Sequence, residues 1–209
     1  MIDRLKNWVS DNPDLAFAIL LSVCVYSYFA VTSEFFATHR TAFAIMERFA
    51  VLGLVGLALT LCIIAGEIDL SIGSNAALSA VITVRFTDSL GAVNALLIAL
   101  AVSTIIGIIQ GYFIAYLRVR AIVLTVGTLM LLRGVAQFAA EEKTVMLTDF
   151  RVPDFISTKM LWYFSPASLL VIAMFVVVGL FMSYTRYGRE IYAFGGARKE
   201  ALAWGIDLK

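Results

Sequence analysis

Long apolar runs separated by short polar segments dominate the chain. The first covers residues 15–31, the second begins near Phe49, and further runs cover residues 92–117, 121–140 and 167–185. A helix needs about 20 predominantly apolar residues to cross the hydrocarbon core of a bilayer. The pattern therefore predicts an all-α, polytopic transmembrane protein with about six spans. We expect residues 1–185 to form the transmembrane region and residues 186–209 to form a cytoplasmic tail.

The segment GEIDLSIGS, from Gly66 to Ser74, interrupts the second apolar run with two acids and two glycines. The apolar residues that follow it, 75–84, are too few to span a bilayer alone, so we expect a broken helix here. Gly66 would let the chain leave one helix, and Asp69 or Ser71 would cap the next, beginning near Leu70. A helix break at membrane depth persists only where it is buried in protein or lines a polar cavity.

Two interpretations of this break remain open. Asp69 either caps the helix that follows or presents its carboxylate to a passing solute, as broken helices do in transporters. Glu67 is either a functional acid or a side chain solvated at the membrane interface. The candidate residues of a solute path are Glu67, Asp69, Ser71, Ser74, Asn75 and Gln110.

Composition narrows the classes of function. The 209 residues are 61% hydrophobic and carry a net charge of +1, without the basic patch that a nucleic-acid partner would need. Cys24, Cys62 and the single His39 lie apart, so the spacing predicts neither a metal site nor a disulfide framework. A GxxxxGK[ST] phosphate loop does not occur, so we expect no cofactor on this chain. Lys and Arg modestly favour a cytoplasmic N-terminus.

A GxxxG pattern, Gly107 to Gly111, falls within the run of residues 92–117. Such a pattern permits two helix backbones to approach closely. We therefore expect this face of the helix to pack against a neighbouring helix.

Three segments together resemble one family. GEIDLSIGS resembles its GGIDLSVGS signature, GIIQGYFIAYLRVRAIVLTVGT is similar to its G..NG.LIAYLRVPAFIVTLGT segment, and GREIYAFGGARKEALAWGI is similar to its GR.IYAIGGN.EAARLSGI loop. The family comprises the membrane-spanning permease subunits of bacterial ABC importers of the ribose and monosaccharide type. The three segments lie in the family's order between Gly66 and Ile206.

The resemblance implies a permease subunit in the bacterial inner membrane, surrounded by lipid and paired as a homo- or heterodimer. It also implies a periplasmic sugar-binding protein and a separate ABC ATPase that binds the ATP. The last segment would be the coupling loop that docks the ATPase, with candidate residues Gly188, Arg189, Tyr192, Gly195, Gly196, Glu200, Ala201 and Gly205.

The chain departs from the family pattern at several positions. Glu67 stands where the family usually has glycine, and Gln110 where it has asparagine. The chain also ends at Lys209, directly after the expected coupling loop, whereas the family continues through further spans. We therefore expect an N-terminal portion of a permease, which is a fragment, a truncated product or one half of a two-chain pore.

Other classes of function stay open. One is a proton-coupled secondary carrier in which Glu67 and Asp69 exchange protons as the solute moves. Another is a non-functional truncated permease. An intramembrane enzyme is disfavoured, because residues two apart on a helix do not face each other and no nucleophile and base pair is apparent.

Overall fold

The computed structural model describes residues 9–141, 143, 151–160 and 163–196. Within those ranges the chain is helical and contains no strand, which confirms the predicted all-α class. The six long helices are α2 (Pro13–Thr32), α3 (His39–Ile64), α4 (Ile72–Leu90), α5 (Ala92–Ala115), α6 (Ala121–Ala139) and α8 (Pro166–Tyr184). The two short ones are α7 (Arg151–Ile156) and α9 (Arg186–Gly196).

Five of the long helices, all except α4, are long and apolar enough to cross a membrane. The sixth, α4, is longer than the apolar stretch after the break predicts, because it continues through Arg85 and Asp88 to Leu90. Both charged residues lie on the exposed surface of the last turns of α4, where solvation permits them in a helix. With 19 residues α4 is about 28 Å long at 1.5 Å per residue, but it is not apolar enough to be a candidate span, so the described residues contain five candidate spans where the sequence predicts about six.

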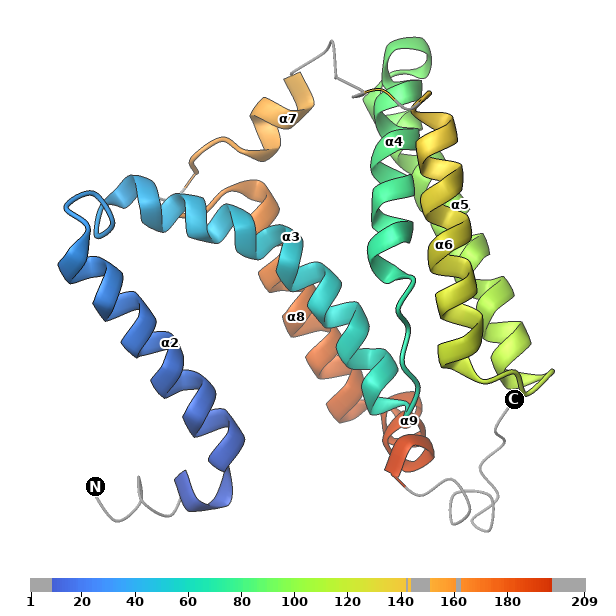
Figure 1. The fold of residues 1–209 in the computed structure, drawn as a ribbon, viewed down its shortest axis with the longest axis horizontal. Coiled ribbons are helices and arrows are strands. Elements are labelled where there is room, and N and C mark those ends of the chain that lie inside the picture. The colour runs from blue at the N-terminus through green and yellow to red at the C-terminus, as the bar shows by residue number, and fades with distance from the viewer. Residues whose placement is uncertain (1–8, 142, 144–150, 161–162, 197–209) are drawn as a thin grey trace.

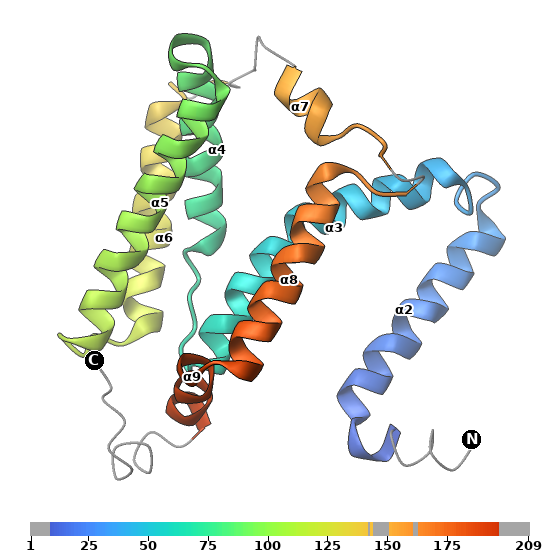
Figure 2. The same cartoon turned by 180° about the vertical axis from the view of Figure 1, so that it is seen from behind.

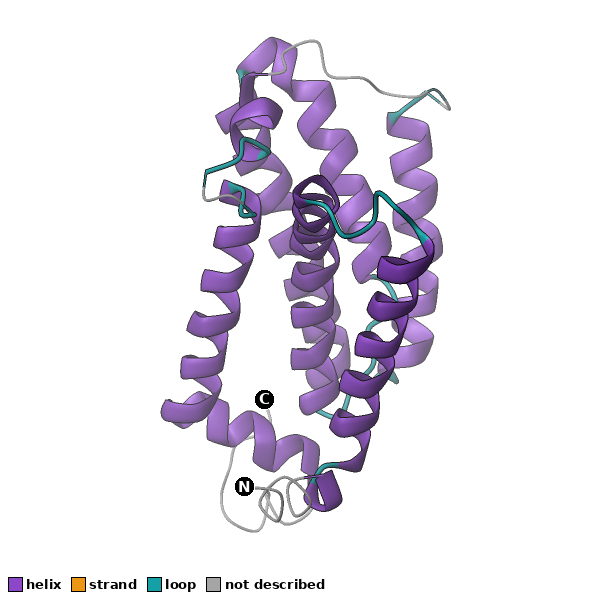
Figure 3. Cartoon of the chain, turned by 90° about the vertical axis from the view of Figure 1, so that its left-hand side faces the viewer, coloured by secondary structure: helices purple, strands orange, loops and turns teal. Residues whose placement is uncertain are grey.

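The helices form two groups that are joined by the chain between α3 and α4. Figure 1 shows α4, α5 and α6 side by side as one bundle, and α3 lying along α8. Helix α2 stands apart from both groups and contains no buried residue (Figure 2). The long helices run roughly side by side along one direction (Figure 3), as expected of membrane-spanning segments.

Small side chains fill the interface between α4 and α5. Ala95 and Ala99 of α5 are fully buried, and the hydroxyl groups of Ser79 and Ser103 lie 2.6 Å apart across the interface. Small residues let two helix backbones approach closely. Gly107 and Gly111 instead lie exposed, with open space where a Cβ atom would project. The expectation that the GxxxG face packs against a neighbour is therefore wrong within the described part of this chain.

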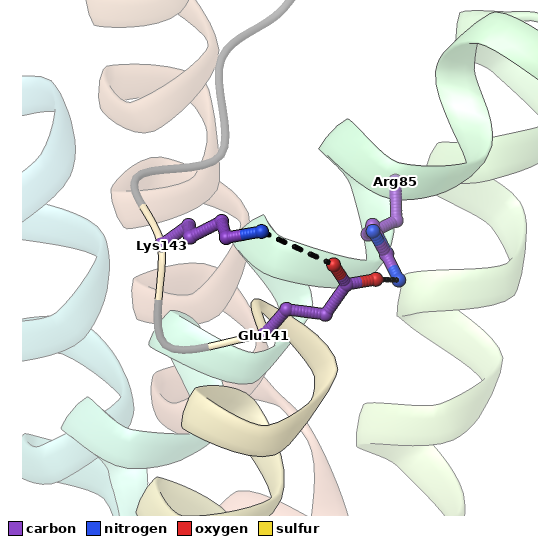
Figure 4. A network of polar contacts seen from close by, with 3 residues as sticks. All are labelled: Arg85, Glu141 and Lys143. Atoms are coloured by element: carbon purple, nitrogen blue, oxygen red, sulfur yellow. Dashed lines mark hydrogen bonds and ion pairs between the residues drawn. The ribbon is translucent and has the colours of Figure 1, made fainter.

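Consecutive helices alternate in direction, so their ends gather at two opposite levels. The end of α3, the turn between α5 and α6, and α9 lie at the lower end of Figure 1. The turn between α4 and α5, the end of α6, and α7 lie at the upper end. At the upper level, a cluster of charges connects the last turns of α4 with the end of α6. Arg85 of α4 contacts Glu141 at 2.6 Å, and Lys143 lies 4.0 Å from the same carboxylate (Figure 4).

Helix α8 begins with a polar cap that is buried against α3. Pro166 occupies the first turn, as its fixed φ favours. Ser165 and Ser168 form a reciprocal capping box, and the Ser165 hydroxyl also donates to the carboxylate of Glu47 on α3. Phe49 and Phe175 stack next along the same pair of helices, with ring centroids 6.0 Å apart. These contacts fix α8 to α3 from its first turn onward.

Candidate functional site: the helix break and the helix beneath it

The helical pattern is interrupted between α3 and α4, where the sequence predicts a break, but α3 and α4 run in opposite directions, so this segment joins two separate helices and does not divide one. Gly66 adopts a left-handed conformation with φ +77°, which closes the C-terminal end of α3. Its N–H donates to the Ile63 carbonyl at 2.9 Å, and the Glu67 N–H donates to the Cys62 carbonyl at 3.0 Å. The chain then leaves the helix and becomes helical again only at Ile72.

Asp69 organises the start of the second helix. Its Oδ1 atom accepts hydrogen bonds from both the backbone N–H and the hydroxyl of Ser71, each at 2.7 Å. Ser71 is the residue that precedes the first turn of α4, so the Asp69 carboxylate satisfies a backbone donor at the helix entrance. The capping interpretation of Asp69 therefore has direct geometric support, with α4 beginning two residues later than expected.

Side chains from two further helices, α5 and α6, contact the residues of the break. Gln110 of α5 donates from Nε2 to the Ser71 hydroxyl oxygen at 2.9 Å, and both residues are buried. Thr125 of α6, which is 1% exposed, lies with its hydroxyl 3.4 Å from the carbonyl oxygen of Ile68. Sequence reasoning missed Thr125, although it stands in the same family-like segment as Gln110. Asp69, Ser71 and Gln110 thus form one hydrogen-bonded chain of polar groups.

The other candidate path residues lie along the same stretch. Glu67 and Ser74 are half-buried. Asn75 lies one turn into α4, and its buried Oδ1 atom has no hydrogen-bond partner among the described residues. One turn further, the Ser79 hydroxyl donates to the Asn75 carbonyl. The structure therefore places all six candidates on or against the residues from Glu67 to Asn75, with Gln110 reaching them from α5.

The distance of this break from the nearest helix ends sets its depth. Thr125 lies four residues after the start of α6, and Gln110 lies five residues before the end of α5. At 1.5 Å per residue, the break is about 6–8 Å from the level at which those helices end. Gln110 and Thr125 thus meet the polar segment within two turns of the ends of their helices.

Two of the expected coupling residues, Gly188 and Gly195, pack against the ends of neighbouring helices. Gly188 is buried, and a Cβ atom there would overlap the backbone of Met182 in the last turn of α8. A Cβ atom on Gly195 would overlap the carbonyl oxygen of Ile64 at the end of α3.

The other described coupling residues of α9 are open to solvent. Arg189, Tyr192 and Gly196 are exposed, and Gly195 is also exposed apart from its contact with the end of α3. Glu200, Ala201 and Gly205 lie outside the described residues. Helix α9 continues through Gly195 and ends at Gly196.

Metal chemistry has no support from the described part of the chain. No group of three His, Cys, Asp or Glu side chains within those residues could hold a metal ion. The site is therefore a polar helix break that offers a carboxylate, hydroxyls and carboxamides.

Irregular polar segments between membrane helices line the binding sites of many transport proteins. Residues 41–209 match the family described as branched-chain amino acid transport system / permease component, and the chain belongs to this family.

Three curated relatives extend the comparison. The chain is 29% identical to the inner membrane ABC transporter permease protein YjfF of Escherichia coli (strain K12), over 94% of this chain and 61% of the relative. It is 26% identical to the D-allose transport system permease protein AlsC of the same organism, over 99% of this chain and 66% of the relative. It is 29% identical to the fructose import permease protein FruG of Bifidobacterium longum (strain NCC 2705), over 77% of this chain and 50% of the relative.

The chain thus spans half to two thirds of the length of these relatives. No solved structure matches the chain. The resemblance to ABC importer permeases that the three motifs carry is confirmed, and the chain is a multi-pass membrane protein of that family.

Proposed function

We propose that this chain is a permease subunit of an ATP-driven importer of monosaccharides, and that the break between α3 and α4 lines the solute path. The observation that carries the proposal is the chain of hydrogen bonds from Asp69 through Ser71 to Gln110, which holds a polar, non-helical segment within an otherwise apolar protein. A non-helical backbone is tolerated at membrane depth where it is buried or lines a polar cavity. The printed names of two relatives, for D-allose and for fructose, favour a monosaccharide as the solute.

Asn75 supplies the most specific solute contact of this proposal. Its Oδ1 atom is buried and lacks a partner among the described residues. A buried acceptor without a hydrogen bond costs about 1–3 kcal/mol. A sugar hydroxyl that donates to Oδ1 would remove that cost, so Asn75 favours a hydroxyl-rich solute.

The exposed face of α9 would dock a separate ABC ATPase. Arg189 and Tyr192 lie on this face, and Tyr192 is 52% exposed. Exposed aromatic and arginine side chains contribute most to protein interfaces. ATP would be bound by that partner, a periplasmic sugar-binding protein would deliver the solute, and a second permease subunit would complete the path. In this arrangement α9 and the N-terminus face the cytoplasm.

Co-purification from native membranes tests the docking surface. We expect the tagged chain to bring down an ABC ATPase, identified by mass spectrometry, and the double variant Arg189→Ala/Tyr192→Ala to recover at least about tenfold less of it. The matched control is Lys143→Ala/Phe155→Ala, which removes an exposed cation and an exposed aromatic ring at the opposite level. Equal recovery of the ATPase by both double variants would contradict docking through α9. Proton-driven uptake by the chain without any ATPase would favour the secondary carrier instead.

A further inference from the structure

Helix α9 is fixed to the membrane helices at both of its ends. Near its start, the Gly188 N–H donates to the Thr185 hydroxyl at 3.0 Å, and Gly188 packs against the backbone of Met182. At its last turn, Gly195 packs against the backbone at the end of α3. The two glycines are seven residues apart, so they lie on one face of the helix. Helix α9 therefore bridges the end of α8 and the end of α3.

The contact at Gly195 involves backbone on both sides. A Cβ atom on Gly195 would lie 2.9 Å from the Ile64 carbonyl carbon and 3.0 Å from that of Ala65, in addition to overlapping the Ile64 oxygen. In the reverse direction, a Cβ atom on Gly66 would lie 3.2 Å from the Gly195 Cα atom. Backbone atoms cannot move aside as a flexible side chain can. A movement of α9 toward the end of α3 must therefore displace residues 64–66, and the break begins at those residues.

We propose that Gly195 is a positioning residue that links α9 mechanically to the helix break. This inference rests on the proposed function, and it assigns to Gly195 a role different from that of the exposed Arg189 and Tyr192. Movement of α9 passes through Gly195 to Gly66, and from there to Asp69 three residues later. Movement at the docking residues of α9 would in this way reach the polar groups that line the proposed path.

The neighbouring glycine provides a matched control. Gly196 is exposed, and a Cβ atom there would meet nothing within 4 Å. Both glycines lie in the last turn of α9, so an alanine changes helix propensity by a similar amount at either position. The variants Gly195→Ala and Gly196→Ala therefore differ in the contact with α3. Gly66→Ala is less suitable, because its positive φ alone strains an alanine.

Hydrogen exchange on the purified chain in detergent tests the link without any partner. The informative amides are those of Gly66 and Glu67, which are hydrogen-bonded to the last turn of α3. We expect their exchange to be about fivefold faster in Gly195→Ala and unchanged in Gly196→Ala. Equal exchange in the two variants would overturn the inference, whatever the protein transports.

A second measurement uses the unmodified chain. It tests the link between α9 and the break even if the Gly195→Ala protein cannot be produced in folded form. Addition of the co-purified ATPase with a non-hydrolysable ATP analogue should change exchange at Gly66 and Glu67 while the Gly91 amide, at the opposite level, stays constant. Unchanged exchange at Gly66 and Glu67 on ATPase binding would overturn the inference. Failure to recover an ATPase would count against the proposed function. The difference in hydrogen exchange between Gly195→Ala and Gly196→Ala would then be the test of the link between α9 and the break.

Discussion

Gln110 donates a hydrogen bond to the hydroxyl oxygen of Ser71 across 39 residues of sequence, and this bond joins α5 to the entrance of α4. The Ser71 hydroxyl donates a hydrogen bond to Asp69 Oδ1. The hydroxyl oxygen of Ser71 is therefore both an acceptor, from Gln110, and a donor, to Asp69. Both partners are buried, which makes the bond hard to replace with water. The break is thus held by a specific polar contact in addition to packing.

Substitution of Gln110 by leucine should loosen this contact. The variant leaves the buried Ser71 oxygen with one hydrogen bond fewer, so we expect a loss of about 1 kcal/mol in the free energy of unfolding. Titration of the detergent-solubilised protein with a denaturing detergent measures this change. Gln137→Leu, at an exposed position of α6, is the control and should change stability by less than about 0.5 kcal/mol. Equal effects of the two substitutions would contradict the importance of the bond.

Ser165, the N-cap residue of α8, should contribute measurably to the free energy of unfolding. Ser165→Ala removes the acceptor for the Ser168 N–H and the donor to Glu47 together, so we expect a cost of about 1–2 kcal/mol. Glu47→Gln should cost less, because an amide oxygen still accepts from Ser165. Thermal unfolding in detergent compares them with Ser183→Ala, an exposed serine near the end of α8. A Ser165→Ala variant as stable as Ser183→Ala would show that the cap is unimportant.

The ion pair between Arg85 and Glu141 should be weak despite its short distance. Both side chains are about half exposed, and exposed pairs contribute about 0.2–1 kcal/mol. A double-mutant cycle with Arg85→Ala and Glu141→Ala should give a coupling energy in this range that falls further in 1 M salt, where the Debye length is about 3 Å. A coupling energy above about 2 kcal/mol, independent of salt, would contradict this description of the upper level.

Asn75 should affect solute binding without affecting the fold. Asn75→Leu removes the buried acceptor, so we expect the KM for monosaccharide uptake to rise about tenfold, the equivalent of one hydrogen bond of about 1.4 kcal/mol. The control is Asn94→Leu, because the Asn94 amide is exposed and donates to the Leu90 carbonyl at the end of α4, far from the break. An unchanged KM in a normally expressed Asn75→Leu variant would remove Asn75 from the solute path.

Hydrophobic pattern and local chemistry account for most of the fold. Runs of about 20 apolar residues predict the long helices, and Gly66 predicts the break. The length of α4 was not predictable from hydropathy, because Arg85 and Asp88 end the apolar run before the helix ends. Charged residues are compatible with a helix wherever their side chains reach water.

Contacts between distant segments were harder to predict. The network at Asp69 and Ser71 follows from local sequence, since the two residues are two apart. The close approach of Gly195 to Ile64 does not follow from local sequence, because 130 residues of chain separate the two segments. A glycine in the sequence also gives no indication of which segment it contacts. The same limit applies to Thr125, whose position in an apolar helix gave no indication that it meets the Ile68 carbonyl.

Uptake by an Asp69→Ala variant tests the central claim most directly. Cells that express the chain with its ATPase and binding-protein partners would be supplied with radiolabelled D-allose and D-fructose, and membrane levels of each variant would be matched. The control is Asp88→Ala, an exposed acid at the far end of the same helix. If the break lines the solute path, Asp69→Ala should reduce uptake at least about tenfold, because the carboxylate that the solute would meet is lost, while Asp88→Ala should transport normally. Uptake near the wild-type rate by a well-expressed Asp69→Ala variant would contradict the proposed path and would leave Asp69 only a cap of α4.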